Sequence, residues 1–303
     1  MILITGASGF IGSSIVKRLN SLQIFDIVTV DYKEPVGVEI SEHLMPWEIL
    51  ESEKSSKIFP KVDLVIHQGA NTSTTDHSRS VIEENFTFSK EILDLCLDND
   101  ARMIYASSAA VYGHGNNGFS VMRDSESPLN IYGYSKLIFD DYVRSVLRLS
   151  MNKSQVVGLR YFNVYGPGEQ NKGKMASTIF HFYNQSINEN TVYPFDGSDN
   201  FFRDFIFIDD VVDQVEFLVN NPDISGIFNC GTGVERSFMD VASIVSNIMD
   251  SKVETIPFPD SLIPHYQRNT KADISIPMSI GFPKPSTTLE EGIKKYIEFL
   301  KSQ

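Results

Sequence analysis

The sequence predicts an α/β fold, in which a doubly wound parallel sheet is covered by helices on both faces. Two observations lead to this prediction. Short apolar runs alternate with amphipathic helical segments through the first half of the chain, as they do in successive βαβ units. The first apolar run ends in a glycine-rich turn that leads directly into a helical segment, which is typical of a Rossmann sheet.

The elements predicted for the first half follow one another at intervals that suit a parallel sheet. Strands are expected at residues 1–6, 26–31, 62–70, 102–109 and 154–166, and helices between them at 10–21, 88–100 and 130–143. The strand segments are apolar almost throughout, because a strand that is covered on both faces has no solvent side. Such a sheet binds its ligands at the carboxyl ends of its strands.

Beyond Gly166 the pattern changes to a polar loop followed by helices and further strands. We expect a loop at 166–177, helices at 178–187, 237–250 and 287–302, a strand running into a helix at 201–219, and a strand ending in a glycine turn at 225–233. The chain is therefore divided into a Rossmann domain, residues 1–165, and a smaller C-terminal lobe, residues 166–303. Segments near 203–220 and 225–232 are expected to return to the first domain, so that the two parts interleave.

The composition is that of an ordinary globular protein with an acidic balance. Of the 303 residues, 42% are apolar and 21% are charged, and the formal net charge is −13. Such an acidic chain is not expected to bind nucleic acid or an anionic membrane. The sequence has no apolar stretch of about 18 residues that could span a membrane, no cationic leader, and no cysteine spacing for a metal. We therefore expect a cytoplasmic protein without a metal site.

The glycine-rich turn after the first strand has the spacing of a nucleotide-binding loop. Gly6, Gly9 and Gly12 allow the backbone to turn tightly and to approach a pyrophosphate at the N-terminus of the following helix. Asp31 ends the second strand, where a carboxylate can bind the 2′-hydroxyl of a ribose. This carboxylate repels a 2′-phosphate and favours NAD, although Lys33 could offset its charge and leave NADP open. A plain tight turn beside an exposed aspartate is the alternative.

The third strand ends in small and polar residues that could lie beneath the same cofactor. Gln68, Gly69, Ala70 and Asn71 would let the backbone approach a ribose and its phosphate. Asn85 precedes the following helix and is a candidate polar tether for this loop, with a helix cap as the alternative.

The segment from residue 130 places Tyr132 and Lys136 four residues apart in the first turns of a helix. Residues i and i+4 share one helix face, so the lysine ammonium could stabilise the tyrosine phenolate. Lowering the pKa of a phenol from about 10 to about 7 takes roughly 4 kcal/mol. Ser108, at the end of the fourth strand, would hold a substrate oxygen. This grouping predicts that a carbinol loses its proton to the tyrosine while its carbon gives hydride to a nicotinamide.

The later residues of this helix divide into an apolar and a polar face. Phe139 and Val143 continue the apolar stripe, whereas Asp140, Asp141 and Arg144 are assigned to the other side. For an isolated pair with this spacing, an exposed tyrosine beside a solvated lysine would be the alternative.

Together, the glycine loop and this pair resemble the extended short-chain dehydrogenase/reductase superfamily. The resemblance extends to the ADP-L-glycero-D-manno-heptose 6-epimerase family through the segments YASSAAVYG, LNIYGYSK, RYFNVYGPGEQNKGKMAS, FDGSDNFFRDF, FNCGTG and IPFPDSLIPHYQ. It implies an enzyme that inverts an exocyclic carbinol of an ADP-heptose with bound NADP, by oxidation to a ketone and reduction on the opposite face. It also implies that the C-terminal lobe mainly binds this nucleotide-diphosphate sugar. We further expect a homo-oligomer.

The motif positions of the family fall on identifiable residues of this chain. Ser108, Tyr132 and Lys136 would form the oxidation site, and Lys172 would be a second acid or base that serves the other face of the ketone. With the glycine loop, the cofactor positions are Gly6, Gly9, Phe10, Ile11, Gly12, Asp31, Tyr32, Lys33, Gln68, Gly69, Ala70, Asn71, Asn85, Tyr132, Lys136, Val164 and Lys172. The substrate positions are Ser108, Asn163, Lys174, His181, Phe195, Asp196, Gly197, Ser198, Arg203 and Tyr266.

Three of these positions have an ordinary structural alternative. The guanidinium of Arg203 can bind a diphosphate through two parallel hydrogen bonds, but it could instead pair with Asp204 or Asp209. His181 lies on an apolar helix face, where a core histidine is the alternative. Without the motif, Lys172 would be assigned as a solvated loop lysine.

This chain departs from the family pattern in two places. Lys174 stands where the family has serine, which leaves the exact sugar open. The segment between Asp31 and Asp63 is shorter than in the family and lacks its basic residue for the 2′-phosphate, which leaves NAD as an alternative to NADP.

Three other functions are weighed against the heptose epimerase. A 4,6-dehydratase of this superfamily needs an Asp-Glu pair after the central hydroxyl residue, and this chain has Ala109 and Ala110 there. A UDP-hexose 4-epimerase could use the same serine, tyrosine and lysine, but Lys172 and the segment IPFPDSLIPHYQ favour the heptose enzyme. A nucleotide-sensing protein without turnover would have no reason to keep those three side chains together.

Overall fold

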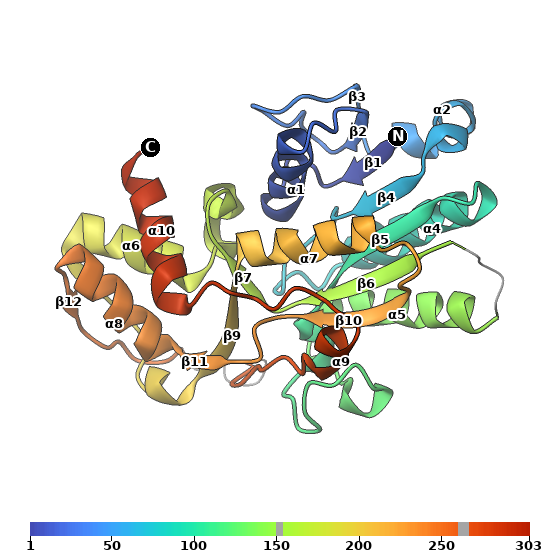
Figure 1. Cartoon of the computed structure of the whole chain (residues 1–303). Coiled ribbons are helices and arrows are strands. Elements are labelled where there is room, and N and C mark those ends of the chain that lie inside the picture. Colours follow the sequence, from blue (N-terminus) through green and yellow to red (C-terminus); the bar gives the residue numbers. More distant parts are fainter. Residues whose placement is uncertain (150–153, 260–266) are drawn as a thin grey trace.

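A computed structural model describes residues 1–149, 154–259 and 267–303 (Figure 1). In this part of the chain, the central sheet has seven strands, all parallel, in the order β10-β6-β5-β4-β1-β2-β3. The strands are β1 (Ile2–Thr5), β2 (Ile27–Val30), β3 (Glu42–Leu44), β4 (Leu64–His67), β5 (Arg102–Ser108), β6 (Val156–Tyr161) and β10 (Gly226–Cys230). Strand order reverses between β1 and β4, where such a sheet opens a crevice for ligands. The predicted Rossmann-type α/β fold is confirmed.

Helices cover both faces of this sheet, as Figure 1 shows. They are α1 (Phe10–Ser21), α2 (Ser52–Ile58), α3 (Ser80–Ile82), α4 (Phe88–Asp98), α5 (Ile131–Arg148) and α7 (Ile208–Asn220). Helices α1 and α7 pack in one core with Ile4 and Ile66, whereas α4 and α5 pack in another core with Leu3 and Val65. Adjacent residues of one strand thus enter opposite cores, as the pleat requires. This explains why the strand segments are apolar without alternation.

The C-terminal half adds small sheets and helices beside the main sheet, mostly at the left of Figure 1, with α9 (Ser275–Ser279) below β10. The added elements are β7 (Asn163–Tyr165), β8 (Thr191–Val192), β9 (Phe202–Phe207), β11 (Glu235–Ser237), β12 (Lys252–Val253), α6 (Thr178–Glu189), α8 (Phe238–Met249), α9 (Ser275–Ser279) and α10 (Leu289–Lys301). Strand β9 pairs in parallel with β7 and antiparallel with β11, and β8 pairs with β12. Strand β10 joins the main sheet beside β6. The domain boundary between residues 165 and 166 stays a prediction.

The single strand predicted at 154–166 is two strands in the structure, and this prediction was wrong in that respect. β6 belongs to the main sheet and β7 to the smaller one, and the N–H of Phe162 between them donates to the carbonyl of Cys230 at 3.0 Å. The chain therefore changes sheets directly after the carboxyl end of β6. Sequence patterns also missed β3 and the short 3₁₀ and π turns, which lie at Glu48–Leu50, Phe59–Lys61, Glu83–Thr87, Ala109–Tyr112, Arg123–Ser125, Glu169–Met175 and Ser198–Asn200.

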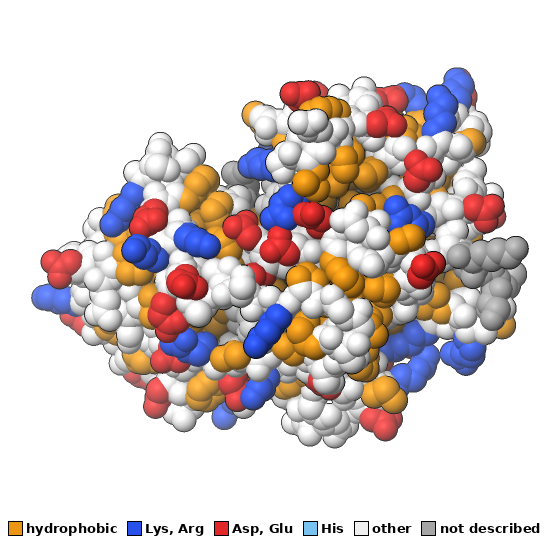
Figure 2. Space-filling model, in the orientation of Figure 1, with side chains coloured by type: hydrophobic (Ala, Val, Ile, Leu, Met, Phe, Trp, Pro, Cys, Tyr) orange, Lys and Arg blue, Asp and Glu red, His pale blue; other side chains and the backbone are white. Residues whose placement is uncertain are grey.

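Acidic and basic side chains are mixed on the face drawn in Figure 2. Arg18 of α1 pairs with Asp213 and Glu216 of α7 at 2.7 and 2.6 Å, which joins the two helices. None of the helices in the described ranges is long and apolar enough to cross a membrane. Cys96 and Cys230 are both buried and form no disulfide.

Candidate active site

The glycine-rich turn and the turn after β4 lie against each other at the carboxyl end of the sheet. Gly6 has a φ of +66°, and a Cβ there would lie 2.5 Å from the backbone nitrogen of Gly69. A Cβ at Gly12 would lie 2.1 Å from the carbonyl oxygen of Gly6. Both positions therefore require glycine. Helix α1 begins after this turn with no acidic residue in its first turn, so its N–H groups suit an anionic ligand.

Asp31 is fixed against the glycine-rich turn by backbone hydrogen bonds. Its Oδ2 accepts from the N–H of Ser8 at 2.8 Å and its Oδ1 from the N–H of Tyr32 at 2.7 Å. The Ser8 hydroxyl donates to the carbonyl of Lys33. The carboxylate is therefore held at the end of β2, where it could accept a hydrogen bond from a ribose hydroxyl. Tyr32 itself is exposed and lies 6.4 Å, between ring centroids, from Trp47.

The turn after β4 carries a buried donor that no described residue accepts from. Gln68 Oε1 accepts from the Tyr161 hydroxyl at 3.0 Å, whereas Gln68 Nε2 is buried without a partner among the described residues. Asn85 Oδ1 accepts from the N–H of Asn71 at 2.7 Å and Asn85 Nδ2 donates to the Asn71 carbonyl at 2.9 Å. The glycine contacts, the acid at the end of β2 and the unpaired amide together fit a dinucleotide.

Tyr132 lies in the first turn of α5, one turn before Lys136 and close to Ser108. Helix α5 is capped by Asn130, whose Oδ1 accepts from the N–H of Gly133 at 2.8 Å. Ser108 is the last residue of β5, and its Oγ accepts from the N–H of Ala110 at 3.1 Å. Burial raises the pKa of the Tyr132 phenol, and a hydrogen bond with Ser108 partly opposes that rise. The net effect of the protein's own groups is thus to raise this pKa, and the expected lowering depends on a bound cation.

Lys136 points from α5 to the end of β5. Its side chain is buried, and its Nζ donates to the carbonyl of Ala106 at 2.9 Å. Burial lowers the pKa of Lys136 to about 8, and the charge of Asp140 opposes this shift. At pH 7 the amine therefore remains mainly protonated, so that it can supply a positive charge beside the reacting groups.

Asp140 lies on the buried face of α5, so its assignment to the solvent side was wrong. Its Oδ1 accepts from the hydroxyl of Tyr105 at 2.9 Å and its Oδ2 from Ser107 Oγ at 3.0 Å. Arg160 of β6, also fully buried, donates its Nε to the same Oδ2 at 2.9 Å. The apolar stripe could not reveal this, because the group that stabilises the buried carboxylate comes from another strand.

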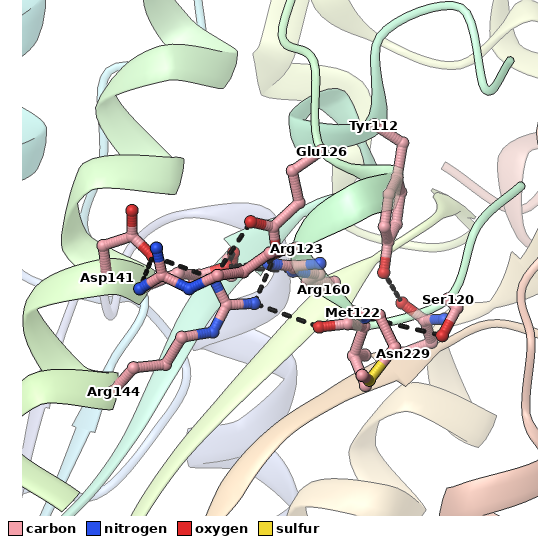
Figure 3. Close-up of polar contacts among 12 residues, drawn as sticks. Tyr112, Ser120, Met122, Arg123, Glu126, Asp141, Arg144, Arg160 and Asn229 are labelled. Atoms are coloured by element: carbon pink, nitrogen blue, oxygen red, sulfur yellow. Dashed lines mark hydrogen bonds and ion pairs between the residues drawn. The ribbon is translucent and has the colours of Figure 1, made fainter. Parts of the chain in front are cut away.

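The charges continue from Arg160 to the surface of α5, as Figure 3 shows. Glu126 pairs with both Arg160 and Arg144, and Arg144 Nη1 donates to Asp141 at 2.9 Å. Asp141 also pairs with Arg123 at 3.0 Å. This ion cluster joins the segment that contains Glu126 to α5 and to β6. The cluster thereby holds the part of α5 that follows Tyr132 and Lys136.

A cavity of about 570 Å³ is lined by residues between Phe162 and Ile256, and Ser108, Tyr132 and Lys136 are not among its lining residues. The sequence-predicted residues that line it are Asn163, Val164, Lys172, His181, Phe195, Ser198 and Arg203. Ser108 pairs in register with Tyr161 of β6, and the chain enters the cavity wall one residue later, at Phe162. The cavity is thus built on the turn where the chain changes sheets.

Lys172 lies on the 3₁₀ turn Glu169–Met175, at the wall of the cavity. Its Nζ is 5.5 Å from the ring centroid of Phe10, the first residue of α1. Burial lowers the pKa of Lys172, and the charge of Glu169 opposes the shift. Glu169 is fully buried and accepts from the N–H of Ser177 and from its hydroxyl, both at 2.6 Å. The turn is thereby attached to the start of α6.

The other predicted substrate positions differ in their burial and in whether they line the cavity. Arg203 is buried, and its Nη1 donates to the carbonyls of Phe202 and Arg268 at 2.9 and 2.8 Å. Lys174, Asp196 and Gly197 are exposed and are not among the residues that line the cavity. Tyr266 lies outside the described residues.

Sequence reasoning missed most of the apolar wall of the cavity. The lining residues missed are Phe162, Met175, Ala176, Ser177, Thr178, Phe182, Gln185, Tyr193, Pro194, Phe205, Phe238 and Ile256, of which Ser177, Thr178 and Gln185 are polar. Phe162 and Phe205 lie within recognised segments and could have been found by their place next to Asn163 and Arg203. Tyr193 and Ile256 follow β8 and β12, whose pairing no sequence pattern indicated.

Comparison with known proteins gives consistent matches over the whole chain. A sequence model described as the NAD dependent epimerase/dehydratase family matches residues 2–231. A protein of Brachyspira hyodysenteriae named ADP-L-glycero-D-manno-heptose-6-epimerase is 43% identical over 311 residues, with 99% of this chain and 98% of that protein covered.

Two solved structures share the fold at similar lengths. ADP-L-glycero-D-manno-heptose-6-epimerase of Helicobacter pylori matches with a TM-score of 0.83 and 29% identity, covering 100% of this chain and 96% of its own. MoeE5 in complex with UDP-glucose and NAD matches with a TM-score of 0.84 and 25% identity, covering 99% and 98%. The resemblance drawn from the sequence motifs is confirmed.

Proposed function

Because this chain belongs to the NAD dependent epimerase/dehydratase family, we propose that it is a nucleotide-sugar epimerase that interconverts ADP-D-glycero-D-manno-heptose and ADP-L-glycero-D-manno-heptose. The 43% identical relative bears the name of that activity and aligns over nearly all of both chains. The observation that carries the proposal is the position of Tyr132 and Lys136 in the first turns of α5, with Tyr132 bonded to Ser108 at the end of β5. A second, half-buried amine, that of Lys172, lies at the wall of the cavity.

The first half of the reaction uses the groups of β5 and α5. Ser108 would hold the carbinol oxygen of the substrate, and Tyr132 would remove its proton. When bound, an oxidised nicotinamide cofactor supplies a hydride acceptor and a positive charge. Lys136 stays mainly protonated at pH 7 and would add a positive charge to the site, whereas the lowering of the Tyr132 pKa is expected from the bound cation. The result is a ketone on the exocyclic carbon.

The second half requires an acid on the other face of the ketone. Lys172 comes from a different element, lines the cavity and has a lowered pKa, so its ammonium would donate a proton more readily than an exposed lysine. Rotation about the exocyclic bond would present the second face while the sugar stays bound. Two protonatable groups on separate elements suit inversion, whereas a simple dehydrogenase needs one.

For the cofactor we propose NAD in preference to NADP. Both oxygens of Asp31 accept backbone N–H groups, so the carboxylate stays at the end of β2 and would repel a 2′-phosphate. The sequence between Asp31 and Asp63 also lacks the basic residue that the resemblance leads us to expect. Denaturing the purified protein and identifying the released dinucleotide tests this choice, and recovery of NADP would contradict it.

The diphosphate and the sugar are proposed to occupy the cavity. Arg203, His181 and Asn163 line it with polar groups, and its aromatic wall would cover the apolar surface of a nucleotide. The C-terminal lobe, residues 166–303, would thus mainly bind substrate and residues 1–165 the cofactor. We also keep as proposals a homo-oligomer and a cytoplasmic location, the latter supported by two buried cysteines without a disulfide.

The test is incubation of the protein with ADP-D-glycero-D-manno-heptose, followed by chromatographic separation of the two epimers. We expect both epimers to appear, from either starting compound, without added oxidant. A UDP-hexose 4-epimerase is the second candidate, because MoeE5, solved with UDP-glucose and NAD, shares the fold at 25% identity. Turnover of UDP-glucose with no change in ADP-heptose would reject the heptose assignment and keep the chemistry.

A further inference from the structure

A continuous chain of buried hydrogen bonds connects the turn after β4 to the helix that carries Tyr132. Its central member is His67, the last residue of β4. His67 Nδ1 lies 2.6 Å from the hydroxyl of Thr5, which also accepts from the N–H of Gly69 at 3.0 Å. His67 Nε2 lies 2.8 Å from Ser89 Oγ, and that hydroxyl donates to the carbonyl of Asn85.

From Asn85 the chain divides toward the two parts of the site. Its side chain binds both backbone groups of Asn71, and its Nδ2 also donates to Ser135 Oγ at 2.9 Å. The Ser135 hydroxyl donates to the carbonyl of Tyr132 at 2.7 Å. Asn85 lies in the π-helical turn Glu83–Thr87, an irregularity that often marks functional sites. Five side chains take part in these hydrogen bonds, and all five are almost completely buried: Thr5, His67, Asn85, Ser89 and Ser135.

The direction of each hydrogen bond follows from its neighbours. The Ser89 proton goes to the Asn85 carbonyl, so Ser89 Oγ must accept from His67 Nε2–H. The neutral ring then has Nδ1 as an acceptor, which takes the proton of Thr5 and leaves Thr5 Oγ1 free to accept from Gly69. A second proton on the ring would remove the acceptor that Thr5 needs. Burial, aided by the charge of Lys136, lowers the pKa of His67 to about 3.

We propose that His67 is a positioning residue, whose two hydrogen bonds, to Thr5 and to Ser89, join the turn at Gly69 to the segment that carries Asn85. The Asn85 side chain in turn joins Asn71 to Ser135 in the first turns of α5. The turn that would support the cofactor and the phenol of Tyr132 are thereby held as one unit. The inference rests on the proposed function, since it assigns Tyr132 a reacting role. A histidine suits this place because its ring presents one acceptor and one donor on opposite sides, in a fixed plane.

A second threonine–histidine pair between neighbouring strands of the main sheet provides a matched control. Thr5 and His67 are register partners on β1 and β4, and Thr29 and His43 are register partners on β2 and β3. His43 Nδ1 also lies near its threonine hydroxyl, at 3.0 Å, but β3 is the edge strand of the main sheet. A substitution at His43 therefore removes a similar pair outside the chain of hydrogen bonds.

The experiment compares His67→Leu, His67→Gln and His43→Leu for NADH affinity, measured by fluorescence titration, and for epimerase turnover. We expect His67→Leu to raise the NADH dissociation constant and to lower kcat, each at least ten-fold. His67→Gln keeps one donor and one acceptor and should recover most of both losses, and His43→Leu should stay within two-fold. Values within two-fold for His67→Leu, or equal losses for His43→Leu, would overturn the proposal.

A double-substitution cycle separates positioning from a general loss of packing. If His67 and Ser135 belong to one chain, the turnover losses of His67→Leu and Ser135→Ala should not multiply, and the double variant should match His67→Leu within about three-fold. Losses that multiply would contradict a single unit. If the parent protein epimerises no sugar, the proposed function is wrong. The NADH affinities of the variants still test the positioning role of His67 in that case.

Nuclear magnetic resonance of the parent protein labelled with ¹⁵N-histidine tests the chain without any substitution that could impair folding. The His67 signal, assigned by its absence from His67→Gln or by its contacts with Thr5, should be that of a neutral ring with the proton on Nε2 throughout pH 5–8. A proton on Nδ1, or a charged ring at pH 6, would contradict the hydrogen-bond direction on which the proposal depends.

Discussion

The two amines proposed for proton transfer are held in different ways. Lys136 lies inside the helix Ile131–Arg148, is bonded to the end of β5, and has the buried pair of Asp140 and Arg160 behind it. Lys172 lies on a 3₁₀ turn that contains Gly173 at a φ of +55°, and this turn is attached to α6 through Glu169. The first amine belongs to a rigid element with many supports, and the second to a short turn with few.

This difference fits the two halves of the proposed reaction. Oxidation needs a serine, a tyrosine and a charged lysine in one fixed arrangement, which a helix and a strand end can provide. Re-reduction must meet a substrate that has turned, so its acid can come from a separate turn at the cavity wall. The regions should therefore respond differently to substitution, with larger losses on the helix.

The largest expected effect is that of Tyr132→Phe. Removing the hydroxyl removes the group that takes the carbinol proton, so turnover should fall by about 10³- to 10⁴-fold. Circular dichroism and NADH affinity should remain those of the parent, because the aromatic ring is kept. Turnover within ten-fold of the parent would contradict the role of Tyr132. It would also remove the expected difference between substitutions on α5 and substitutions on the turn that carries Lys172.

The second largest effect concerns the buried ion pair of Asp140 and Arg160 that holds α5. It is tested by comparing substitutions at two adjacent residues of that helix, Asp140 and Asp141. Asp140→Asn leaves the buried Arg160 with Glu126 as its remaining carboxylate partner among the described residues, so the free energy of unfolding in urea should fall by about 3 kcal/mol. Asp141→Asn, at a partly exposed site, should change it by about 0–1 kcal/mol. Similar losses from the two variants would show that the buried pair does not stabilise α5 as described.

A third prediction concerns acid stability and His67. The folded pKa of about 3 lies below the ordinary value of 6.5, so protonation favours the unfolded chain. The stability that depends on the neutral ring is present above pH 6.5 and is lost as pH falls toward 3. In that window the parent should lose about 1.4 kcal/mol per pH unit from this group.

Urea unfolding at several pH values between 6.5 and 4 measures this slope. His67→Gln does not titrate, so its slope should be smaller than that of the parent, whereas His43→Gln should keep the slope of the parent. An equal slope in the parent and in His67→Gln would show that His67 is protonated in the folded protein.

The sequence was sufficient for regions in which spacing along one element determines position. The glycine-rich turn, the ends of β2 and β4, and the helix with Tyr132 were all predicted from such spacing. It was insufficient where a residue depends on a partner in another element. Asp140 looked like a solvent-facing acid because its partner Arg160 comes from β6, and the His67 chain joins side chains from four separate segments.

The C-terminal half was harder to predict for a related reason. The apolar run at 154–166 looked like one strand, and only pairing with β9 reveals that it crosses between two sheets. Lys172 was recognised through the family resemblance and not through its own surroundings. Its support by Glu169 depends on the fold of a turn, which has no periodic signal.

The smallest expected effect tests the turn that carries Lys172. Glu169 raises the pKa of Lys172 against the effect of burial, so Glu169→Gln should move this pKa further below its ordinary value. The pH at which Lys172 loses its proton should move down accordingly. Nuclear magnetic resonance of ¹³C-methylated lysines, assigned with Lys172→Arg, measures it. Glu84→Gln, at an exposed acid, is the control, and an unchanged or raised pKa in Glu169→Gln would contradict the coupling.

The most direct test of the proposed chemistry follows the hydrogen on the inverted carbon. ADP-heptose labelled with deuterium at the exocyclic carbinol carbon is incubated in ordinary water, and the epimer formed is analysed by mass spectrometry. Transfer to a bound nicotinamide and return to the same carbon predicts that the product keeps its deuterium. Replacement of the label by solvent hydrogen would contradict oxidation to a ketone and would indicate inversion by removal of a proton from carbon.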